Sequence, residues 1–401
     1  MKNCRRKPRL AFWFRYGPAE HAELFYALPQ MIAVLSDYFD VYYIGFKSAD
    51  KPEVPEEIRN HARVIQIPVK ISRRSTADKT WKTLLWIAFI PSIALLSRLA
   101  GIRYVYVDET LPLVLPIGRI FFRNRITMTL ADFFLEQYLS KGTFKRRLGS
   151  FIFWMDCRAW KKAPLLFTRS RSAQERLSRL GIPHEHMHYA YDAIDPLIYH
   201  TYNRMNCRGD WGWEEEDLVM VYHGVLNPAK DLDTVLNALP NVIKEFDQLR
   251  FLILGNGPDE LRLKSKVNEM HLNRHVQFMG YTDPSKVATA LGCGDIGLIS
   301  RKADQGSQLV ITSVLGHCLA CGIAVLAART AGIAELITDG ENGLLFEPGD
   351  STELSQKLLR LCRDAALRKQ LAAAGLKTAE EKLSLEETVT RNTQPLIDLW
   401  G

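Results

Sequence analysis

Several kinds of segment are missing from this sequence of 401 residues. It has no low-complexity tract, no repeat period and no uninterrupted apolar run of the roughly 20 residues that cross a bilayer. The most apolar stretch, residues 84–96, is interrupted by Pro91, so we expect a buried or interfacial helix there. A content of 47% hydrophobic and 24% charged residues excludes disordered and fibrous classes and is typical of a globular protein.

We also expect no signal peptide and no disulfide framework. The basic amino terminus, MKNCRRKPRL, runs directly into a strand-like segment without a long apolar region or a small-residue cleavage site. The seven cysteines are an odd, scattered set, which predicts a reducing, cytoplasmic compartment. Cys318 and Cys321 form a CxxC without a second pair, so we expect them to pack in the core and expect no metal site.

Acidic residues are scarce in the first half of the chain. Residues 1–195 hold 31 Lys and Arg against 18 Asp and Glu, a balance of +13, whereas the rest of the chain carries −6. Basic clusters stand beside the aromatic and apolar residues 84–89 and 151–154. These clusters are Lys70, Arg73, Arg74, Lys79 and Lys82, then Lys145, Arg146 and Arg147, then Arg158, Lys161 and Lys162. The pattern favours a peripheral contact with an anionic membrane surface over nucleic-acid binding, with a solvated basic face as the alternative.

The length suits two domains of roughly 200 residues each. We expect an amino-terminal domain over residues 1–198, a second domain over 199–382, and a closing helix over 383–401. In the first domain apolar runs alternate with helical patterns, which is typical of a parallel sheet. The predicted strands are residues 10–14, 39–46, 63–69, 104–107, 126–130, 165–170 and 187–195. After the first strand we expect one helix with a common apolar face formed by Leu24, Phe25, Leu28 and Ile32.

The same alternation continues in the second domain. Strands are predicted over residues 218–223, 251–254, 276–280, 323–326 and 344–346. A helix is expected over residues 232–239, and another, rich in small residues, should end at Cys321 and Gly322. Two glycine-bearing turns follow, with the sequences AGIAE and DGENG. Repeated αβ steps of this kind indicate a doubly wound α/β domain.

The stretch from Gly316 to Asp350 resembles the carboxy-terminal signature of the family-four glycosyltransferases of the GT-B fold. Family members read approximately EAMACGxPVVA, GGxPEVV, DGxxGLLV and PxD, and this chain reads GHCLACGIAVLA, AGIAELI, DGENGLLF and PGD in the same order. The resemblance implies two Rossmann-like doubly wound α/β lobes that face a cleft, an acceptor-binding lobe first and a nucleotide-sugar-binding lobe second. It also implies that the final helix crosses back to the first lobe.

One loop of the second domain suits a diphosphate leaving group. Lys230 follows the strand over residues 218–223 and precedes a helix, where a cation can meet the negative charge of a departing diphosphate. A solvated surface lysine is the alternative interpretation. The loop resembles the family's GRLxxxKG through Gly224, Leu226 and Lys230, but Val225 replaces the arginine and removes one of two expected phosphate-binding cations.

Further donor-binding residues are implied by the resemblance. Gly255 and Gly257 match the family's GxGP turn, where glycine lets a nucleotide approach the backbone. Thr312 and Ser313 stand where relatives have phosphate-binding hydroxyls at a helix start, so their hydroxyls could cap the helix, bind a phosphate or do both. Glu335 takes the position of the glutamate in GGxPEVV.

The two glutamates that the family places at the donor centre are absent. Counting back from Cys321 and Gly322, their positions are occupied by Leu309 and His317. A neutral imidazole at His317 can accept one hydrogen bond from a donor ribose hydroxyl, whereas an imidazolium accepts none. We therefore expect donor affinity to fall as the pH drops through the ordinary histidine pKa of about 6.5. An ordinary buried histidine is the alternative.

In the first lobe the resemblance points to two residues. Gly17 lies in the turn after the first strand and, with Ala19 and Glu20, matches part of the family's GGAER, where backbone N–H groups approach a ligand. Asp132 follows a later strand, where relatives have a residue that lines the cleft near the transferred sugar. A helix-capping aspartate is the alternative for Asp132.

The sequence therefore predicts a glycosyltransferase that moves a sugar from a nucleotide-diphospho-sugar to a lipid-linked or other cell-envelope glycan acceptor. By the resemblance, it retains the anomeric configuration, needs no metal or other cofactor, and uses Asp132 and Lys230 as catalytic residues. The missing glutamates leave two alternatives open. One is a GT-B pseudoenzyme that binds a partner or nucleotide without turnover, and the other is a different GT-B enzyme such as a nucleotide-sugar epimerase.

Overall fold

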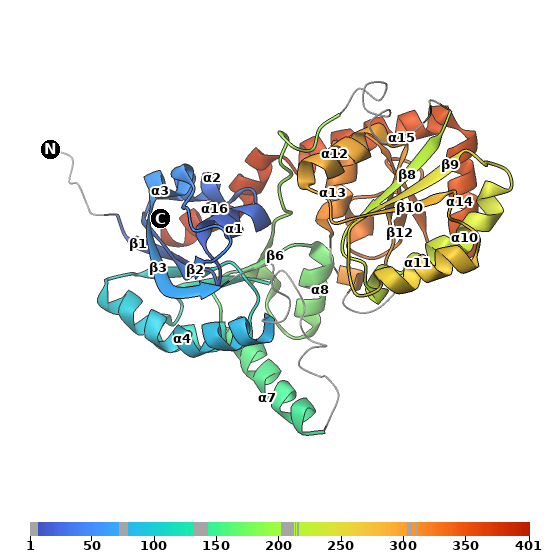
Figure 1. Cartoon of the computed structure of the whole chain (residues 1–401). Coiled ribbons are helices and arrows are strands. Elements are labelled where there is room, and N and C mark those ends of the chain that lie inside the picture. Colours follow the sequence, from blue (N-terminus) through green and yellow to red (C-terminus); the bar gives the residue numbers. More distant parts are fainter. Residues whose placement is uncertain are drawn as a thin grey trace. The chain divides into compact units, whose positions relative to one another are not determined.

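A computed structural model describes residues 7–71, 79–130, 143–201, 212, 214, 216–302, 307–309 and 311–401. The chain forms two compact units (Figure 1). Unit 1 is Met1–Ala193 together with Leu385–Gly401, and unit 2 is Ile194–Ser384. The last helix of the chain therefore packs with the first unit, as the sequence predicted.

Unit 1 is built on a sheet of parallel strands. In the described residues this sheet has seven strands in the order β3-β2-β1-β4-β5-β6-β7. The strands are β1 (Arg9–Trp13), β2 (Asp40–Ser48), β3 (Ala62–Ile71), β4 (Tyr104–Val107), β5 (Ile126–Leu130), β6 (Leu166–Thr168) and β7 (Met187–Tyr189). The residues of β4 and β5 are buried on both faces, which is the pattern of a parallel sheet with helices on both sides.

Helices cover both sides of this sheet. They are α1 (Pro18–Leu24), α2 (Leu28–Ser36), α3 (Glu56–His61), α4 (Lys79–Leu99), α5 (Val114–Phe122), α7 (Thr143–Trp160), α8 (Arg171–Arg179) and α16 (Leu385–Trp400). Figure 1 shows α4 and α7 on one side of the sheet, and α1, α2, α3 and α16 on the other. The closing helix α16 packs on α2, and its Trp400 ring stacks on Tyr104 with 4.8 Å between the ring centroids.

The single helix predicted after β1 is two helices. α1 ends at Leu24 and α2 begins at Leu28, because Pro29 in the first turn of α2 has no N–H to bond the Phe25 carbonyl and continue one helix. The predicted apolar face is therefore wrong at Leu24, which is 43% exposed. Phe25, Leu28 and Ile32 are buried as expected.

The helix α4 corrects a second prediction. Pro91 does not interrupt it, and the helix runs from Lys79 to Leu99. Within it, Trp81–Leu99 is long and apolar enough to cross a membrane by length and composition, so the prediction of a run too short to do so is wrong. About 33% of that stretch is buried, including Trp86 and Ile90, which pack in the core of unit 1.

Unit 2 repeats the architecture with a second parallel sheet. Its described strands follow the order β10-β9-β8-β11-β12-β13. They are β8 (Leu218–His223), β9 (Leu249–Leu254), β10 (Val276–Gly280), β11 (Ile296–Ile299), β12 (Ala324–Ala328) and β13 (Leu344–Phe346). The helices are α10 (Leu232–Ile243), α11 (Glu260–Glu269), α12 (Pro284–Cys293), α13 (Ser313–Ala320), α14 (Ser351–Arg363) and α15 (Ala365–Lys382), and the short 3₁₀ turns are η3 (Pro228–Lys230), η4 (Ser307–Leu309) and η5 (Ile333–Glu335).

The strand order reverses once in each sheet. In unit 1 the reversal lies between β1 and β4, and in unit 2 it lies between β8 and β11. In doubly wound sheets ligands bind outside the carboxyl ends of the strands at such a reversal. The residues that follow β1, β4, β8 and β11 are therefore the places where the fold positions a functional site.

Candidate functional site

The loop after β8 is packed tightly against the loop after β9. The Leu226 N–H donates to the Asn256 carbonyl with 2.9 Å between nitrogen and oxygen. A Cβ atom on Gly255 would lie 2.0 Å from the Gly224 carbonyl oxygen, and one on Gly257 would lie 2.1 Å from the Leu226 carbonyl oxygen. The packing of the two loops thus requires both glycines. Donor binding by Gly224, Gly255 and Gly257 stays a prediction.

Lys230 is the last residue of η3, directly ahead of α10. The Asn227 side chain caps this turn by accepting a backbone N–H at 3.1 Å. Asp231 follows in the left-handed region, with φ of 49°. Burial, and then the charge of Arg301, lowers the pKa of Lys230 to about 8. The lysine therefore presents a half-buried cation close to the start of α10, and its catalytic role stays a prediction.

The loop after β11 folds onto the loop after β8. The Ser300 hydroxyl donates to the Asp231 carbonyl at 3.1 Å, and the Lys302 N–H donates to a carbonyl in η3 at 3.0 Å. Between these two bonds stands Arg301, whose charge acts on Lys230. Sequence reasoning missed Arg301, since no local pattern shows that two loops 69 residues apart come together.

His317 lies on α13 beside two other rings. Tyr199 stacks on its imidazole with 3.7 Å between the ring centroids, and the His223 ring centroid is 5.2 Å away. Burial, and then the charge of His223, lowers the pKa of His317 well below its usual value. Burial, and then the charge of Lys230, lowers the pKa of His223 to about 4. Both imidazoles are therefore neutral at pH 7, as ribose binding by His317 requires, although that role stays a prediction.

Two of the predicted donor residues stand at the start of α13. Thr312 occupies the N-cap position, but its hydroxyl makes no capping hydrogen bond, and Ser313 is exposed. Glu335 lies in η5, which is tied to the segment before α13 by the Gly332 N–H donating to the Gln308 carbonyl at 2.8 Å. The fold thus brings these residues of unit 2 onto connected loops, and their donor-binding roles stay predictions.

Of the two site residues predicted in the first lobe, the structure describes only Gly17. Gly17 follows β1 as the N-cap of α1, and its N–H donates to the Glu20 side chain at 3.3 Å. A Cβ atom there would lie 3.2 Å from the Ser48 Cβ, a contact that is tight but short of a backbone clash. Donor binding by Gly17 stays a prediction, and Asp132 lies outside the described residues.

A buried network of charged and polar groups lies at the reversal point of unit 1. Asp108, which follows β4, lies 3.0 Å from the His21 Nε2 and 3.3 Å from the Arg169 guanidinium. It also accepts the hydroxyls of Thr129 at 2.8 Å and Tyr106 at 2.9 Å. Burial alone would raise the pKa of Asp108, but the His21 hydrogen bond and the Arg169 charge hold it well below its usual range. The carboxylate therefore stays ionised and fixes the elements around it.

Glu109, the next residue, is a candidate acid–base group that sequence reasoning missed. Its Oε1 accepts the Arg15 N–H at 2.8 Å, and its Oε2 lies 3.5 Å from the Arg15 Nε. Burial raises the pKa of Glu109 to about 7 in spite of the Arg15 charge. Shifted carboxyl groups of this kind occur at functional sites and in structural ion pairs alike. The raised pKa of Glu109 is caused by burial, which cannot be predicted from a local sequence pattern.

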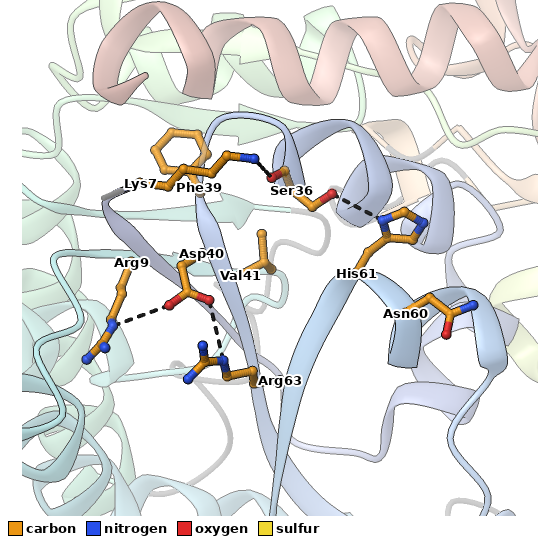
Figure 2. Close-up of a pocket in the computed structure, with 9 residues that line it drawn as sticks. All are labelled: Lys7, Arg9, Ser36, Phe39, Asp40, Val41, Asn60, His61 and Arg63. Carbon is orange, nitrogen blue, oxygen red and sulfur yellow. Dashed lines mark hydrogen bonds and ion pairs between the residues drawn. The ribbon is translucent and has the colours of Figure 1, made fainter. Parts of the chain in front are cut away.

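Unit 1 also has a pocket at the amino ends of its strands, away from the carboxyl ends where the fold positions a functional site (Figure 2). It is lined by residues at the amino ends of β1, β2 and β3. The Asp40 carboxylate lies 3.4 Å from the Arg9 Nε and 3.5 Å from the Arg63 Nε, and Figure 2 shows it between the two. Lys7 donates to the Ser36 carbonyl at 2.7 Å. Because its charges are already engaged and it faces away from the carboxyl ends, this pocket does not coincide with the candidate site.

The cysteines of the CxxC are structural. Cys318 and Cys321 are free and buried, and burial raises the pKa of the Cys321 thiol to about 12, which disfavours the thiolate that binds zinc. Among the described residues no group of three or more His, Cys, Asp or Glu could hold a metal ion. Cys293, in contrast, is disulfide-bonded.

Two doubly wound units, with the closing helix returned to the first, define the GT-B fold. A crystal structure of Anabaena HepE in complex with UDP is similar, with a TM-score of 0.71 and 18% identity over 98% of this chain and 99% of that chain. Residues 203–378 match the family described as glycosyl transferases group 1. Most of unit 2 therefore matches the model of this family, and the predicted GT-B fold and the resemblance to glycosyltransferases of that fold are confirmed.

Two relatives illustrate the range of similar proteins. N-acetyl-alpha-D-glucosaminyl L-malate synthase of Bacillus anthracis is 25% identical over 223 residues, or 55% of this chain and 56% of that protein. Phosphatidyl-myo-inositol mannosyltransferase of Mycobacterium leprae is 32% identical over 148 residues, or 37% of this chain and 38% of that protein. The chain thus spans about half or less of the length of these two relatives.

Proposed function

We propose that this chain transfers a sugar from a nucleoside-diphospho-sugar to a lipid-linked or other cell-envelope glycan acceptor. The observation that carries the proposal is Lys230, a half-buried cation at the reversal point of unit 2 that has no carboxylate partner among the described residues. A cation held in this way suits the negative charge that develops on a diphosphate leaving group. The family of unit 2 and the names of its relatives support the same class of reaction.

Different groups of unit 2 would bind different parts of the donor. With a pKa of about 8, Lys230 is mostly protonated at pH 7 and neutralises part of the diphosphate charge. The amino end of α13, with Thr312 and Ser313, presents backbone N–H groups and hydroxyls to an anion. The neutral His317 accepts a hydrogen bond from a ribose hydroxyl. These groups position the donor and stabilise the leaving group, so the proposal needs no metal or other cofactor.

The acceptor and the stereochemistry belong to the proposal as well. One relative is named for a phosphatidyl-inositol acceptor and the other for L-malate. We favour the lipid-linked acceptor because unit 1 presents an apolar and basic face, described below. Retention of the anomeric configuration is proposed from the resemblance to family-four enzymes.

A thermal-shift screen of UDP-, GDP-, ADP- and TDP-sugars, followed by a turnover assay on each sugar that binds, tests the proposal. Lys230→Ala should weaken binding of the nucleotide sugar by about 1.5 to 3 kcal/mol, as for one charge-assisted contact. Lys244→Ala is the matched control, because Lys244 is exposed at the opposite end of α10. Equal affinity in folded Lys230→Ala and wild type would contradict the proposal, and binding without transfer to any acceptor would favour the pseudoenzyme.

We also propose that unit 1 rests on an anionic membrane surface through an apolar-basic face on α4, α5 and α7. Its exposed apolar side chains are Trp81, Leu84, Leu95, Leu96, Leu99, Ile120, Leu148, Phe151 and Trp154. Its exposed basic side chains are Arg98 of α4 and Arg147 and Arg158 of α7, and the exposed Lys161 and Lys162 follow directly after α7. Lys82 is not part of this face, since its side chain is only 3% exposed, which corrects its place in the predicted cluster.

The arrangement suits a protein that lies on a bilayer without crossing it. Figure 1 shows α4 and α7 on the same side of the sheet. Aromatic side chains such as Trp81, Phe151 and Trp154 favour the interface, and basic residues favour the anionic lipids of the cytoplasmic leaflet. The burial of Trp86 and Ile90 against the core of unit 1 favours this reading over a membrane-spanning α4.

Co-sedimentation with vesicles tests the membrane proposal. Reversing Arg147, Lys161 and Lys162 to Glu should release the protein from phosphatidylserine-containing vesicles, since each basic residue at such a surface contributes about 1 kcal/mol. Reversal of the exposed Lys244, Lys369 and Lys382 of unit 2 is the control. Equal sedimentation of wild type with neutral and anionic vesicles would contradict the proposal, and tight, salt-sensitive binding to nucleic acid would assign the basic face to that partner.

A further inference from the structure

The loops after β8 and β11 meet at the reversal point of unit 2, where a doubly wound sheet binds its ligand. Two hydrogen bonds join the loops, and they flank Arg301 on one loop and Lys230 on the other. These bonds run from the Ser300 hydroxyl to the Asp231 carbonyl at 3.1 Å, and from the Lys302 N–H to the Ala229 carbonyl at 3.0 Å. The side chains of Arg301 and Lys230 therefore start from neighbouring points of the backbone.

The charge of Lys230 is opposed by a cation and not by a carboxylate. Lys230 has no carboxylate partner in the described part of the chain, and its neighbour His223 is held neutral, its pKa lowered to about 4 by burial and then by Lys230. After burial, the charge of Arg301 is the cause that lowers the pKa of Lys230, which shows that the two cations repel each other. An anion with more than one negative charge, bound by both, would relieve that repulsion.

We infer that Arg301 binds the diphosphate of the donor together with Lys230. The inference rests on the proposed function, which assigns the donor to unit 2. Val225, on the β8 loop, is 56% exposed and carries no charge, so the second cation comes from the β11 loop instead. A guanidinium presents a planar fork of N–H donors that engages two phosphate oxygens at once, whereas an ammonium acts as a point charge.

This arrangement makes the length of the phosphate chain a determinant of binding. Lys230 and Arg301 approach from two different loops, so a diphosphate can contact both, whereas a monophosphate satisfies mainly one of them. Loss of the guanidinium should therefore weaken diphosphate binding much more than monophosphate binding.

Isothermal titration with UDP, UMP, GDP and GMP tests the inference on the full chain. Arg301→Met should weaken binding of the preferred diphosphate about tenfold or more, the effect expected of a lost charge-assisted contact, and should change monophosphate binding little. Arg301→Lys should be intermediate, because it keeps the charge and loses the fork. Adding Val225→Arg to Arg301→Met should recover part of the diphosphate affinity. Arg274→Met, at an exposed arginine that precedes β10, is the matched control.

The outcomes separate this inference from the proposed function. If wild type binds a nucleoside diphosphate and Lys230→Ala weakens it, but Arg301→Met binds like wild type, the inference is overturned and the proposed function stands. If wild type binds no nucleoside diphosphate, both are overturned. If Arg301→Met does not fold, Arg301→Lys decides, because unchanged diphosphate affinity in that variant also overturns the role of the fork.

Discussion

At the scale of single residues, His317 shows how burial changes an expected pH response. Its ring is stacked on Tyr199 and lies near His223, and burial, followed by the charge of His223, lowers its pKa well below the ordinary value of 6.5. The imidazole therefore remains neutral, and able to accept a hydrogen bond, at pH values where an exposed histidine is protonated. The predicted loss of donor affinity near pH 6.5 is thus moved to lower pH.

We expect the affinity for a nucleotide sugar not to fall from pH 7.5 to pH 6, and to rise slightly as Lys230, with a pKa of about 8, completes its protonation. A nucleotide sugar is the suitable probe, since its esterified diphosphate does not titrate in this range. The measurement is the dissociation constant at half-unit steps of pH for wild type and His317→Gln. A decrease centred near pH 6.5 in wild type that is absent from His317→Gln would show that the ring titrates normally.

His223 links the buried imidazoles to the stability of the fold. Its pKa is about 4 in the folded chain and about 6.5 when unfolded, so the unfolded chain takes up a proton first as the pH falls. The stability contribution is therefore complete above pH 6.5 and is lost as the pH falls toward 4. A difference of about 2.5 pKa units corresponds to roughly 3 kcal/mol.

We expect His223→Gln to lose less stability than wild type between pH 7 and pH 4.5. Denaturant unfolding at several pH values, with His61→Gln as an exposed control, measures the difference. Parallel stability curves for wild type and His223→Gln would mean that the ring is protonated in the folded chain.

At the scale of elements, α4 continues through a residue that usually ends a helix. Pro91 has no N–H to bond the Ile87 carbonyl, and its side chain is exposed. We expect Pro91→Ala to restore this bond and to raise the free energy of unfolding by about 1 kcal/mol, well below the roughly 3 kcal/mol of an ideal helix interior. Denaturant unfolding measures the change, and Pro68→Ala on β3 is a proline control outside helices. A loss of stability would show that the packing of α4 needs the bend that proline introduces.

The strands were largely predictable from the sequence. The predicted bounds are confirmed to the residue for β4, β5, β8, β10 and β13, because short apolar runs bounded by turn residues are a strong local signal. The prediction over residues 187–195 was too long, since β7 ends at Tyr189. Beyond Tyr189 the Asp195 carboxylate accepts a hydrogen bond from the Leu197 N–H at 2.9 Å and forms a turn. Such side-chain hydrogen bonds compete with strand pairing, and the pattern of apolar residues does not reveal them.

The helices and the site were less predictable, for two physical reasons. The break between α1 and α2 and the continuity of α4 depend on whether the structure around Pro29 and Pro91 tolerates a missing hydrogen bond. The position of Arg301 depends on the order of the strands, since its loop meets that of Lys230 only because β8 and β11 are neighbours. Sequence motifs predicted the loop of Lys230, but contacts between loops that are distant in the chain cannot be predicted from a single sequence.

At the scale of the whole molecule, α16 ties the end of the chain to unit 1. Val389, Leu396 and Trp400 are buried in the core of that unit, and Trp400 stacks on Tyr104. Loss of large buried side chains typically costs 3 to 5 kcal/mol each for an aromatic residue and about 2 to 5 for leucine. Deletion of residues 385–401 should therefore unfold unit 1 or lower its melting temperature strongly, while unit 2 keeps its core.

Scanning calorimetry with limited proteolysis measures this effect. In the deletion variant we expect early cleavage in residues 7–193 and a surviving fragment within residues 194–384. Trp400→Ala should give the same pattern in milder form. Simultaneous loss of both units in the deletion variant would show that they unfold as one.

The place of α16 also sets an order of events during synthesis on the ribosome. The strands of unit 1 emerge first, yet the helix that covers α2 and Tyr104 leaves the ribosome only after all of unit 2. Amino-terminal domains usually fold first as they emerge, but here residues 194–384 are free to fold before unit 1 is complete. Nascent unit 1 therefore carries an uncovered apolar surface throughout translation of unit 2, which makes this interval the one in which a chaperone would bind.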